Sequence, residues 1–246
     1  ELAFTQEDKG LLLSAFAAGY SLTQVVGGVA ADRFGGAPLL MIALLAAGGG
    51  LLILPFAARA GLSELWWLLW AMGVMQGPVY AASVASASKW TSRGTKSFAS
   101  AVIGAGTPTG SLLALGVTPM LASRLGWHTT SWMFGGCILL FAAFMSRHVR
   151  SSPEVSEGST PENPPASDVQ TYVRLLLSPA VFSIFVAHCV HNFVRYFVVS
   201  WMPSYFNDVL QASPDAAGLQ LLLPELASAI TGLVSARWAR GGDEAA

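Results

Sequence analysis

Charge is scarce in this sequence, since only 11% of its 246 residues are Asp, Glu, Lys or Arg. A soluble globular domain carries about 25% charged residues, so this chain cannot cover its surface with solvated groups. The net charge of −1 provides no basic excess to neutralise phosphates, which argues against a nucleic-acid partner. Cysteine is scarce too. Cys137 and Cys189 fall inside apolar blocks, which predicts two buried thiols and no disulfide framework.

What the sequence has instead is apolar residues in long blocks, with 53% of the chain hydrophobic. A helix that crosses a lipid bilayer needs about 20 mainly apolar residues. The blocks lack the alternation of a membrane barrel, so helices are favoured over strands. The pattern predicts an all-α, polytopic transmembrane helical bundle. Its seven spans are residues 10–31, 39–58, 65–88, 97–121, 129–146, 179–202 and 215–236.

The positions of Lys and Arg predict how the spans are oriented, because cytoplasmic loops carry an excess of both. The richer side is therefore expected to face the cytoplasm or its organellar equivalent, with the first residue outside and the last inside. Its basic residues are Arg33, Lys89, Arg93, Lys96, Arg147, Arg150, Arg174, Arg237 and Arg240. The other side has Lys9, Arg59 and Arg124, and Arg195 lies within a span.

A polar segment separates the fifth span from the sixth. Residues 151–168 read SSPEVSEGSTPENPPASD, which is rich in Pro, Ser and Glu and cannot bury a core. This composition predicts a flexible linker. We therefore expect an N-terminal half at 1–146 with five spans, a central linker at 147–178, and the start of a C-terminal half at 179–246 with two spans and a tail.

The first span carries polar side chains on one face. At 100° per residue, Tyr20, Thr23, Gln24 and Gly27 point the same way. Polar groups in hydrocarbon usually face a bundle interior or a wet cavity, or they bond a neighbouring helix. Both interpretations, the wall of a solute cavity and an interhelical bond, remain open here. Gly28 is expected to let another helix approach closely.

The turn after this span, Asp32-Arg33-Phe34-Gly35-Gly36, places opposite charges beside glycines. It is typical of a solvated turn, or it forms a charge lock that makes and breaks during transport. Further along, Gln76 and Tyr80 lie one turn apart and are candidates for the same cavity.

Small residues also recur in the third and fourth spans. Gly-x-x-x-Gly spacing lets backbones approach closely, and proline kinks a helix, so these spans are expected to pack tightly or to rock. The residues concerned are Gly73, Gly77, Gly104, Gly106, Pro108 and Gly110.

The span at 179–202 has the clearest polar stripe. His188, His191, Asn192 and Arg195 fall within about 100° of arc. An Arg at this depth needs a partner, a wet cavity or an escape to the interface, so an anion-facing Arg195 and a snorkelling one both remain open. Two His with no Cys, Asp or Glu on the same helix face make a poor metal site, and a proton-responsive His is the better interpretation. No motif of a hydrolase, P-loop or zinc protease occurs, so catalysis has no support.

One stretch carries a family pattern. GYSLTQVVGGVAADRFGG, at residues 19–36, resembles the second helix and first cytoplasmic loop of major facilitator superfamily transporters, and Gly28, Asp32, Arg33 and Gly35 match the loop signature. More narrowly, the chain is similar to the anion:cation symporter branch, which includes plastid phosphate transporters. The motifs that recur in order are SKW at 88–90, GTPTGS at 106–111, GW at 126–127 and HNFVRYFVVSWMPSYFNDVL at 191–210. The last resembles plant and algal plastid anion transporters most.

The resemblance implies a partial major facilitator fold in which these spans are the second to eighth of twelve, with the missing helices in the same parent chain. It also implies alternating access between two halves, coupled to H⁺ or Na⁺. A plastid inner envelope or thylakoid membrane is the expected location, with a plasma or vesicle membrane as the other option. The sequence also departs from the family at several positions. Leu69 and Gln76, in the third span, stand where the family has a basic and an acidic residue, and Arg195 stands where the family has a neutral one.

We therefore expect a symporter of a small anion, either inorganic phosphate or an organic carboxylate, that needs no cofactor besides its coupling ion. The alternatives are a seven-helix membrane receptor, a truncated transporter without activity and, more weakly, an intramembrane enzyme. The expected conformational lock comprises Gly28, Asp32, Arg33 and Gly35. The expected substrate-binding residues are Arg195, His191, Asn192, His188, Tyr20, Gln24, Gln76 and Tyr80.

Overall fold

The computed structural model describes residues 4–91, 96–148, 174, 177–211, 222–224, 226–228, 230–231 and 234. All regular secondary structure in these ranges is helical, which confirms the predicted all-α class. The chain divides into two compact units, one made of Glu1–Pro153 with Leu222–Ala246 and the other of Glu154–Leu221.

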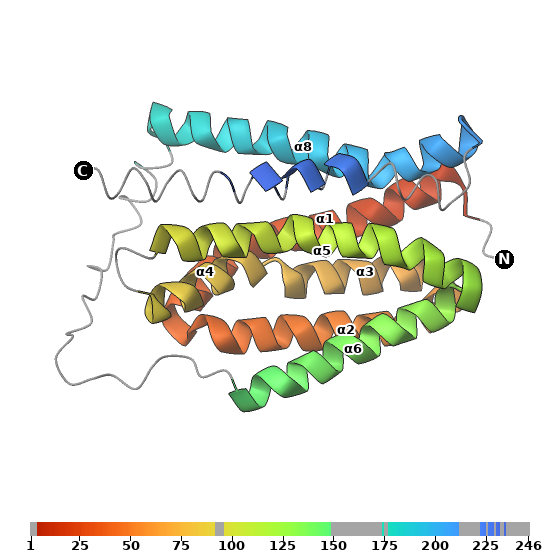
Figure 1. The fold of residues 1–246 in the computed structure, drawn as a ribbon, viewed down its shortest axis with the longest axis horizontal. Helices are drawn as coiled ribbons and strands as arrows, with labels where there is room; N and C mark the ends of the chain where they lie inside the picture. Colours follow the sequence, from red (N-terminus) through yellow and green to blue (C-terminus); the bar gives the residue numbers. More distant parts are fainter. Residues whose placement is uncertain are drawn as a thin grey trace. The chain divides into compact units, whose positions relative to one another are not determined.

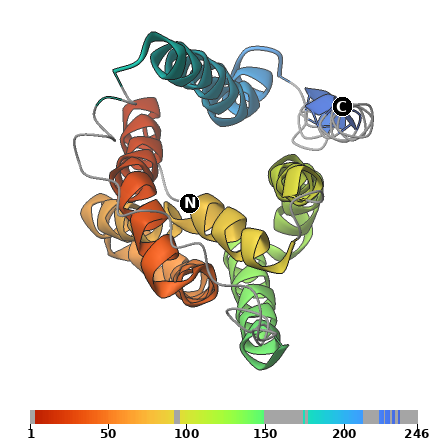
Figure 2. The same ribbon diagram turned by 90° about the vertical axis from the view of Figure 1, so that its left-hand side faces the viewer.

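The helices of the first unit run up and down along a common direction, lengthwise in Figure 1 and nearly end-on in Figure 2. They are α1 (Gln6–Phe34), α2 (Gly36–Ala60), α3 (Leu62–Gln76), α4 (Val79–Trp90), α5 (Lys96–Leu125) and α6 (Trp127–His148). The second unit contains α8 (Pro179–Asp208).

Six helical stretches within the described residues are long and apolar enough to cross a membrane, and they match the first six predicted spans. The third stretch, Leu62–Trp90, comprises α3 and α4 together. The seventh predicted span, 215–236, lies mostly outside the described residues. Those that are described within it, at 222–224, 226–228, 230–231 and 234, are helical.

The helices extend further than the apolar blocks predicted. α1 begins earlier because Thr5 and Asp8 form a capping box, in which each side chain accepts a bond from the other's backbone N–H. α1 and α5 end at glycines with positive φ, +86° at Gly35 and +80° at Gly126. The apolar content of a segment determines how much of it lies in hydrocarbon, whereas caps determine where the helix begins and ends. The ends of an apolar block and the ends of its helix therefore differ.

The third span is interrupted, whereas the sequence predicted one continuous helix. α3 ends at Gln76 and α4 begins at Val79, with Gly77 and Pro78 between them. Both residues keep right-handed helical backbone angles, so the chain continues in the same direction. Proline has no N–H and its ring clashes with the preceding turn, which explains the break.

The packed interior of the first unit is made mostly of small residues. Leu12 of α1, Ala57 and Ala58 of α2 and Leu65 of α3 form a buried cluster. Large apolar side chains instead lie on the outside, and Leu140, for example, is 73% exposed. In water this distribution would be unfavourable, whereas lipid accommodates it, because its tails are as apolar as leucine.

The prediction that both thiols are buried was wrong, since Cys137 on α6 and Cys189 on α8 are exposed on their helices. Both residues do lie in apolar segments, as the sequence showed. A span that faces lipid is as apolar as one that faces protein, so hydropathy alone does not separate the two environments.

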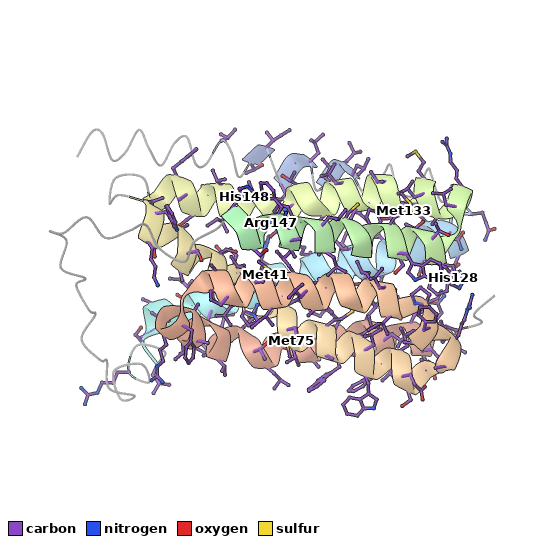
Figure 3. The ribbon with its side chains drawn as sticks, turned by 90° about the horizontal axis from the view of Figure 1, so that it is seen from below. Met41, Met75, His128, Met133, Arg147 and His148 are labelled. Atoms are coloured by element: carbon purple, nitrogen blue, oxygen red, sulfur yellow. The ribbon has the colours of Figure 1, made fainter. Side chains whose placement is uncertain are left out.

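The first unit has Lys9, Arg59 and Arg124 at one end of its helices and Arg33, Lys89, Lys96 and Arg147 at the other, the basic end. The α1–α2 turn and the C-terminal ends of α4 and α6 lie at this end, on the left of Figure 1. Figure 3 shows Arg147 and His148 toward this end of α6 and His128 toward the other. Arg33 and Lys89 also belong to the basic end. The helix directions thus agree with the division of Lys and Arg between two sides that the sequence analysis made. Which of these sides faces the cytoplasm stays a prediction.

Candidate functional site

The polar face of α1 packs against α3. Thr23 donates its hydroxyl to the backbone carbonyl of Val74, with 2.8 Å between the two oxygens. The close approach that allows this bond needs glycine on both helices. A Cβ at Gly19 would collide with the carbonyl of Trp70, and a Cβ at Gly77 would collide with Thr23 Oγ1. For Thr23, the structure therefore favours the interhelical bond over the cavity wall.

The expected close packing of α3 is confirmed at Gly73 and Gly77, whose missing side chains leave room for the α1 backbone. Toward the end of α1 the close contact lies one residue before the predicted Gly28. A Cβ at Gly27 would collide with the ring of Pro78, whereas one at Gly28 would make only ordinary contact with Ala81 at 3.8 Å.

Tyr20 and Gln24 lie on α1 next to this contact. Tyr20 is half-buried and stacks on Phe16, with 6.1 Å between ring centroids, and Gln24 is exposed. The backbone of this turn abuts Gly77, directly after Gln76 in the chain, and the Gln76 side chain is half-buried. The α1 and α3 members of the predicted binding set thus come from adjacent turns of one packed helix pair.

Tyr80 lies beyond the break in the third span. It is the second residue of α4, and its side chain is 53% exposed. The sequence placed Gln76 and Tyr80 one turn apart on a single helix, whereas the structure assigns them to the end of α3 and the start of α4.

The predicted conformational lock sits where α1 turns into α2. Gly35 is buried with φ of +86° and ψ of +151°, a backbone conformation essentially confined to glycine, and it donates its N–H to Ala31. Gly36 packs against the carbonyl of Ala82 and the hydroxyl of Ser86 on α4. Arg33 is exposed at this end, and the side chain of Asp32 lies outside the described part of the molecule.

The polar stripe of the sixth span lies on α8, in the second unit. His188 and His191 are exposed, while Asn192 and Arg195 are partly buried. Asn192 donates its amide to the carbonyl of His188 at 2.9 Å, so that donor is used within the helix. Among the described residues no group of three His, Cys, Asp or Glu side chains comes together in a form that could hold a metal ion.

The glycines of α5 do not behave as predicted. A Cβ at Gly104, Gly106 or Gly110 would meet nothing within 4 Å, so these glycines do not mediate close packing in the described part of the chain. The helix also continues through Pro108 without ending. Spacing alone therefore selected the correct glycines on α3 and the wrong ones on α5.

A second packed pair, between α2 and α6, was missed from the sequence. Gly48 and Gly135 lie backbone to backbone. Ser131 donates its hydroxyl to the carbonyl of Leu51 at 2.6 Å, and Trp132 donates its indole N–H to that of Leu52 at 3.1 Å. Pro55 lies four residues after Leu51, which signals that the Leu51 carbonyl lacks its helical donor. Nothing in the sequence identified Ser131 as the replacement donor.

Comparison with known families decides what kind of protein this is. A sequence model of the Major Facilitator Superfamily matches residues 1–242. The chain belongs to the major facilitator superfamily. This membership makes it a multi-pass membrane protein of a transporter family, not an enzyme, and it overturns the receptor alternative.

Individual superfamily relatives have names that describe anion transport. The chain is 33% identical to "Probable anion transporter 4, chloroplastic" of Oryza sativa subsp. japonica, over 94% of this chain and 41% of that protein. It is 32% identical to "Ascorbate transporter, chloroplastic" of Arabidopsis thaliana, over 90% of this chain and 43% of that protein. It is 29% identical to "Sodium-dependent phosphate transport protein 1, chloroplastic" of the same plant, over 90% of this chain and 45% of that protein. The chain spans less than half the length of these relatives.

Proposed function

We propose that this chain forms part of a secondary transporter that moves a small anion by alternating access. The similarity to three proteins named for the transport of an anion, ascorbate or phosphate carries the proposal, because it extends over nine-tenths or more of the chain. Inorganic phosphate or a small organic carboxylate is the proposed solute; the names themselves cover phosphate and ascorbate, which is also a small organic anion. One relative is named as sodium-dependent, and the His residues on α8 suit proton coupling, so Na⁺ and H⁺ are the candidate driving ions.

Arg195 is the proposed anion-attracting residue. A guanidinium group presents a planar set of donors that matches the oxygens of a carboxylate or phosphate. Arg195 shares one helix face with His188, His191 and Asn192, and burying a charge within a span is costly unless it serves a polar partner or a wet passage. Tyr20, Gln24, Gln76 and Tyr80 are the proposed solute-binding residues of α1, α3 and α4.

The α1–α2 turn is proposed as the conformational lock. Gly35 allows the tight turn there, Gly28 is proposed to belong to the lock two turns earlier on α1, and Asp32 with Arg33 supplies the charges that pair and separate as access alternates. A plastid membrane is the proposed location, because all three relatives described above are named as chloroplastic.

The test is uptake of radiolabelled phosphate, glutamate and ascorbate into liposomes. It uses the longest natural polypeptide that contains this sequence, as wild type and as Arg195→Ala. Removal of a desolvated charge that pairs with the solute is expected to raise the apparent KM at least about tenfold. Arg59→Ala is the matched control, because it removes an exposed guanidinium at the end of α2.

Unchanged kinetics in Arg195→Ala would remove that residue from the mechanism. A wild-type protein that moves none of the three anions would overturn the proposed function itself. Imposed Na⁺ and proton gradients, applied one at a time, identify the driving ion in the same assay.

A further inference from the structure

Pro55 and Pro78, two of the prolines in the helices of the first unit, each release a backbone carbonyl. In an α-helix the N–H of a residue bonds the carbonyl four residues before it, and proline has no N–H. Pro78 therefore leaves the carbonyl of Val74 without its usual donor, and Pro55 in the interior of α2 does the same to Leu51. In hydrocarbon no water is available to replace that bond, so each carbonyl needs another donor.

Both carbonyls receive a hydroxyl from a neighbouring helix. Thr23 of α1 donates to Val74 at 2.8 Å, and Ser131 of α6 donates to Leu51 at 2.6 Å. The two donors lie on α1 and α6, and their acceptors lie on α3 and α2. The same solution thus occurs twice, at Pro78 and at Pro55.

Glycines surround each bond and restrict how the helices can slide. On the α1–α3 pair, Gly27 sits against the ring of Pro78, and Gly77 leaves the space that Thr23 Oγ1 occupies. On the α2–α6 pair, the backbones of Gly48 and Gly135 meet one turn from the bonded serine. A slide of one residue along a helix is about 1.5 Å, which would break a hydrogen bond of this length.

We propose that Thr23 and Ser131 are positioning residues, which fix the register of the α1–α3 and α2–α6 pairs by satisfying the carbonyls that Pro78 and Pro55 release. For transport, which rests on the proposed function, the Thr23 bond matters more. It sets the turn that carries Tyr20 and Gln24 against the turn that carries Gln76. The Ser131 bond holds the second pair as one body.

The test is a double-mutant cycle on the longest natural polypeptide that contains this sequence. The variants are Thr23→Val, Thr23→Ser, Pro78→Ala and the double variant Thr23→Val with Pro78→Ala. Valine keeps the shape of threonine without its hydroxyl, serine keeps the hydroxyl, and alanine at position 78 restores the N–H that Val74 lacks. The melting temperature in detergent, measured without solute, and the KM and Vmax of anion uptake are recorded for each.

A matched control is available on α6. Thr130 is buried, and its hydroxyl and its N–H both donate to the carbonyl of Gly126, so Thr130→Val leaves that carbonyl bonded. Thr130→Val is therefore expected to leave the melting temperature and KM near those of the wild type. The parallel cycle uses Ser131→Ala with Pro55→Ala, and its control is Ser83→Ala, whose hydroxyl donates within α4.

We expect Thr23→Val to lower the melting temperature and to raise KM about threefold to tenfold, the range that interhelical hydrogen bonds in membranes span. Thr23→Ser restores both values, and Thr23→Val has little further effect once Pro78 is replaced by Ala. The Ser131 cycle is expected to show the same coupling in melting temperature.

Three results overturn the proposal. Thr23→Val could behave like Thr130→Val, or its effect could be equally large in the Pro78→Ala background. It could also lower the melting temperature with KM unchanged, which would make Thr23 structural only. A wild type that moves no anion would overturn the proposed function instead, and the solute-free melting temperatures would still decide whether the hydroxyl serves the carbonyl released by proline.

Discussion

Gly73 shows how much a single hydrogen atom in place of a side chain decides in this protein. A Cβ at this position would collide with the backbone carbonyl of Phe16 and the backbone nitrogen of Tyr20 on α1. Backbone atoms cannot rotate away as a side chain can, so the helices themselves would have to separate. Gly49 on α2 is the opposite case, because a Cβ there would meet nothing within 4 Å.

We therefore expect Gly73→Ala to lower the free energy of unfolding by about 1–3 kcal/mol, the usual cost of overpacking. Gly49→Ala should be neutral or should stabilise by up to about 1 kcal/mol, because alanine is the better helix former. Thermal unfolding of the two purified variants in the same detergent provides the comparison. Equal melting temperatures would show that α1 and α3 do not pack as described.

At the scale of elements, the turn between α1 and α2 contains the most constrained backbone of the candidate lock. Gly35 ends α1 and precedes α2 with no intervening loop, at φ of +86° and ψ of +151°. Residues other than glycine are strained at these φ and ψ angles. The adjoining Gly36 is pressed against α4, so the turn has little freedom to relax.

Gly35→Ala is therefore predicted to destabilise the protein by about 1–3 kcal/mol through backbone strain. Gly136→Ala on α6 is the matched control, since that glycine has no positive φ and its Cβ would meet nothing within 4 Å. Melting temperatures measured without solute separate this strain from any effect on transport. A Gly35→Ala protein as stable as Gly136→Ala would contradict the turn geometry.

At the scale of the whole molecule, the arrangement of basic residues predicts which way the protein lies in the membrane. Ser88, near the end of α4, lies at the basic end of the first unit, and Ser123, near the end of α5, lies at the other end. Both side chains are exposed. Because the basic end should face the cytoplasm, the two positions should differ in their access to reagents outside the cell.

The measurement is labelling of single-cysteine variants with a membrane-impermeant maleimide in intact bacteria that express the protein in the plasma membrane. Ser123→Cys should react in intact cells, and Ser88→Cys should react only after the cells are opened. Both are made in a Cys137→Ser, Cys189→Ser background, because those thiols are exposed on their helices. The reverse labelling pattern would overturn the orientation.

Particular residues show where reading the sequence succeeded and where it stopped. Gly73-x-x-x-Gly77 was correctly expected to admit another helix, whereas Gly106-x-x-x-Gly110 has the same spacing and admits none among the described residues. For Thr23 the sequence left open two roles, the wall of a solute cavity and an interhelical bond, because its position on the helix face fits both. The predicted binding residues on α8 stay predictions.

The sequence by itself determined the class of the protein and the course of its spans, because a bilayer contains no water to bond a backbone. Any long apolar segment there must close its hydrogen bonds as a helix, whatever surrounds it. Only the tertiary structure decided which carbonyls prolines leave open and which hydroxyls serve them. That choice depends on which helix lies alongside, and the periodicity of one helix contains no information about its neighbour.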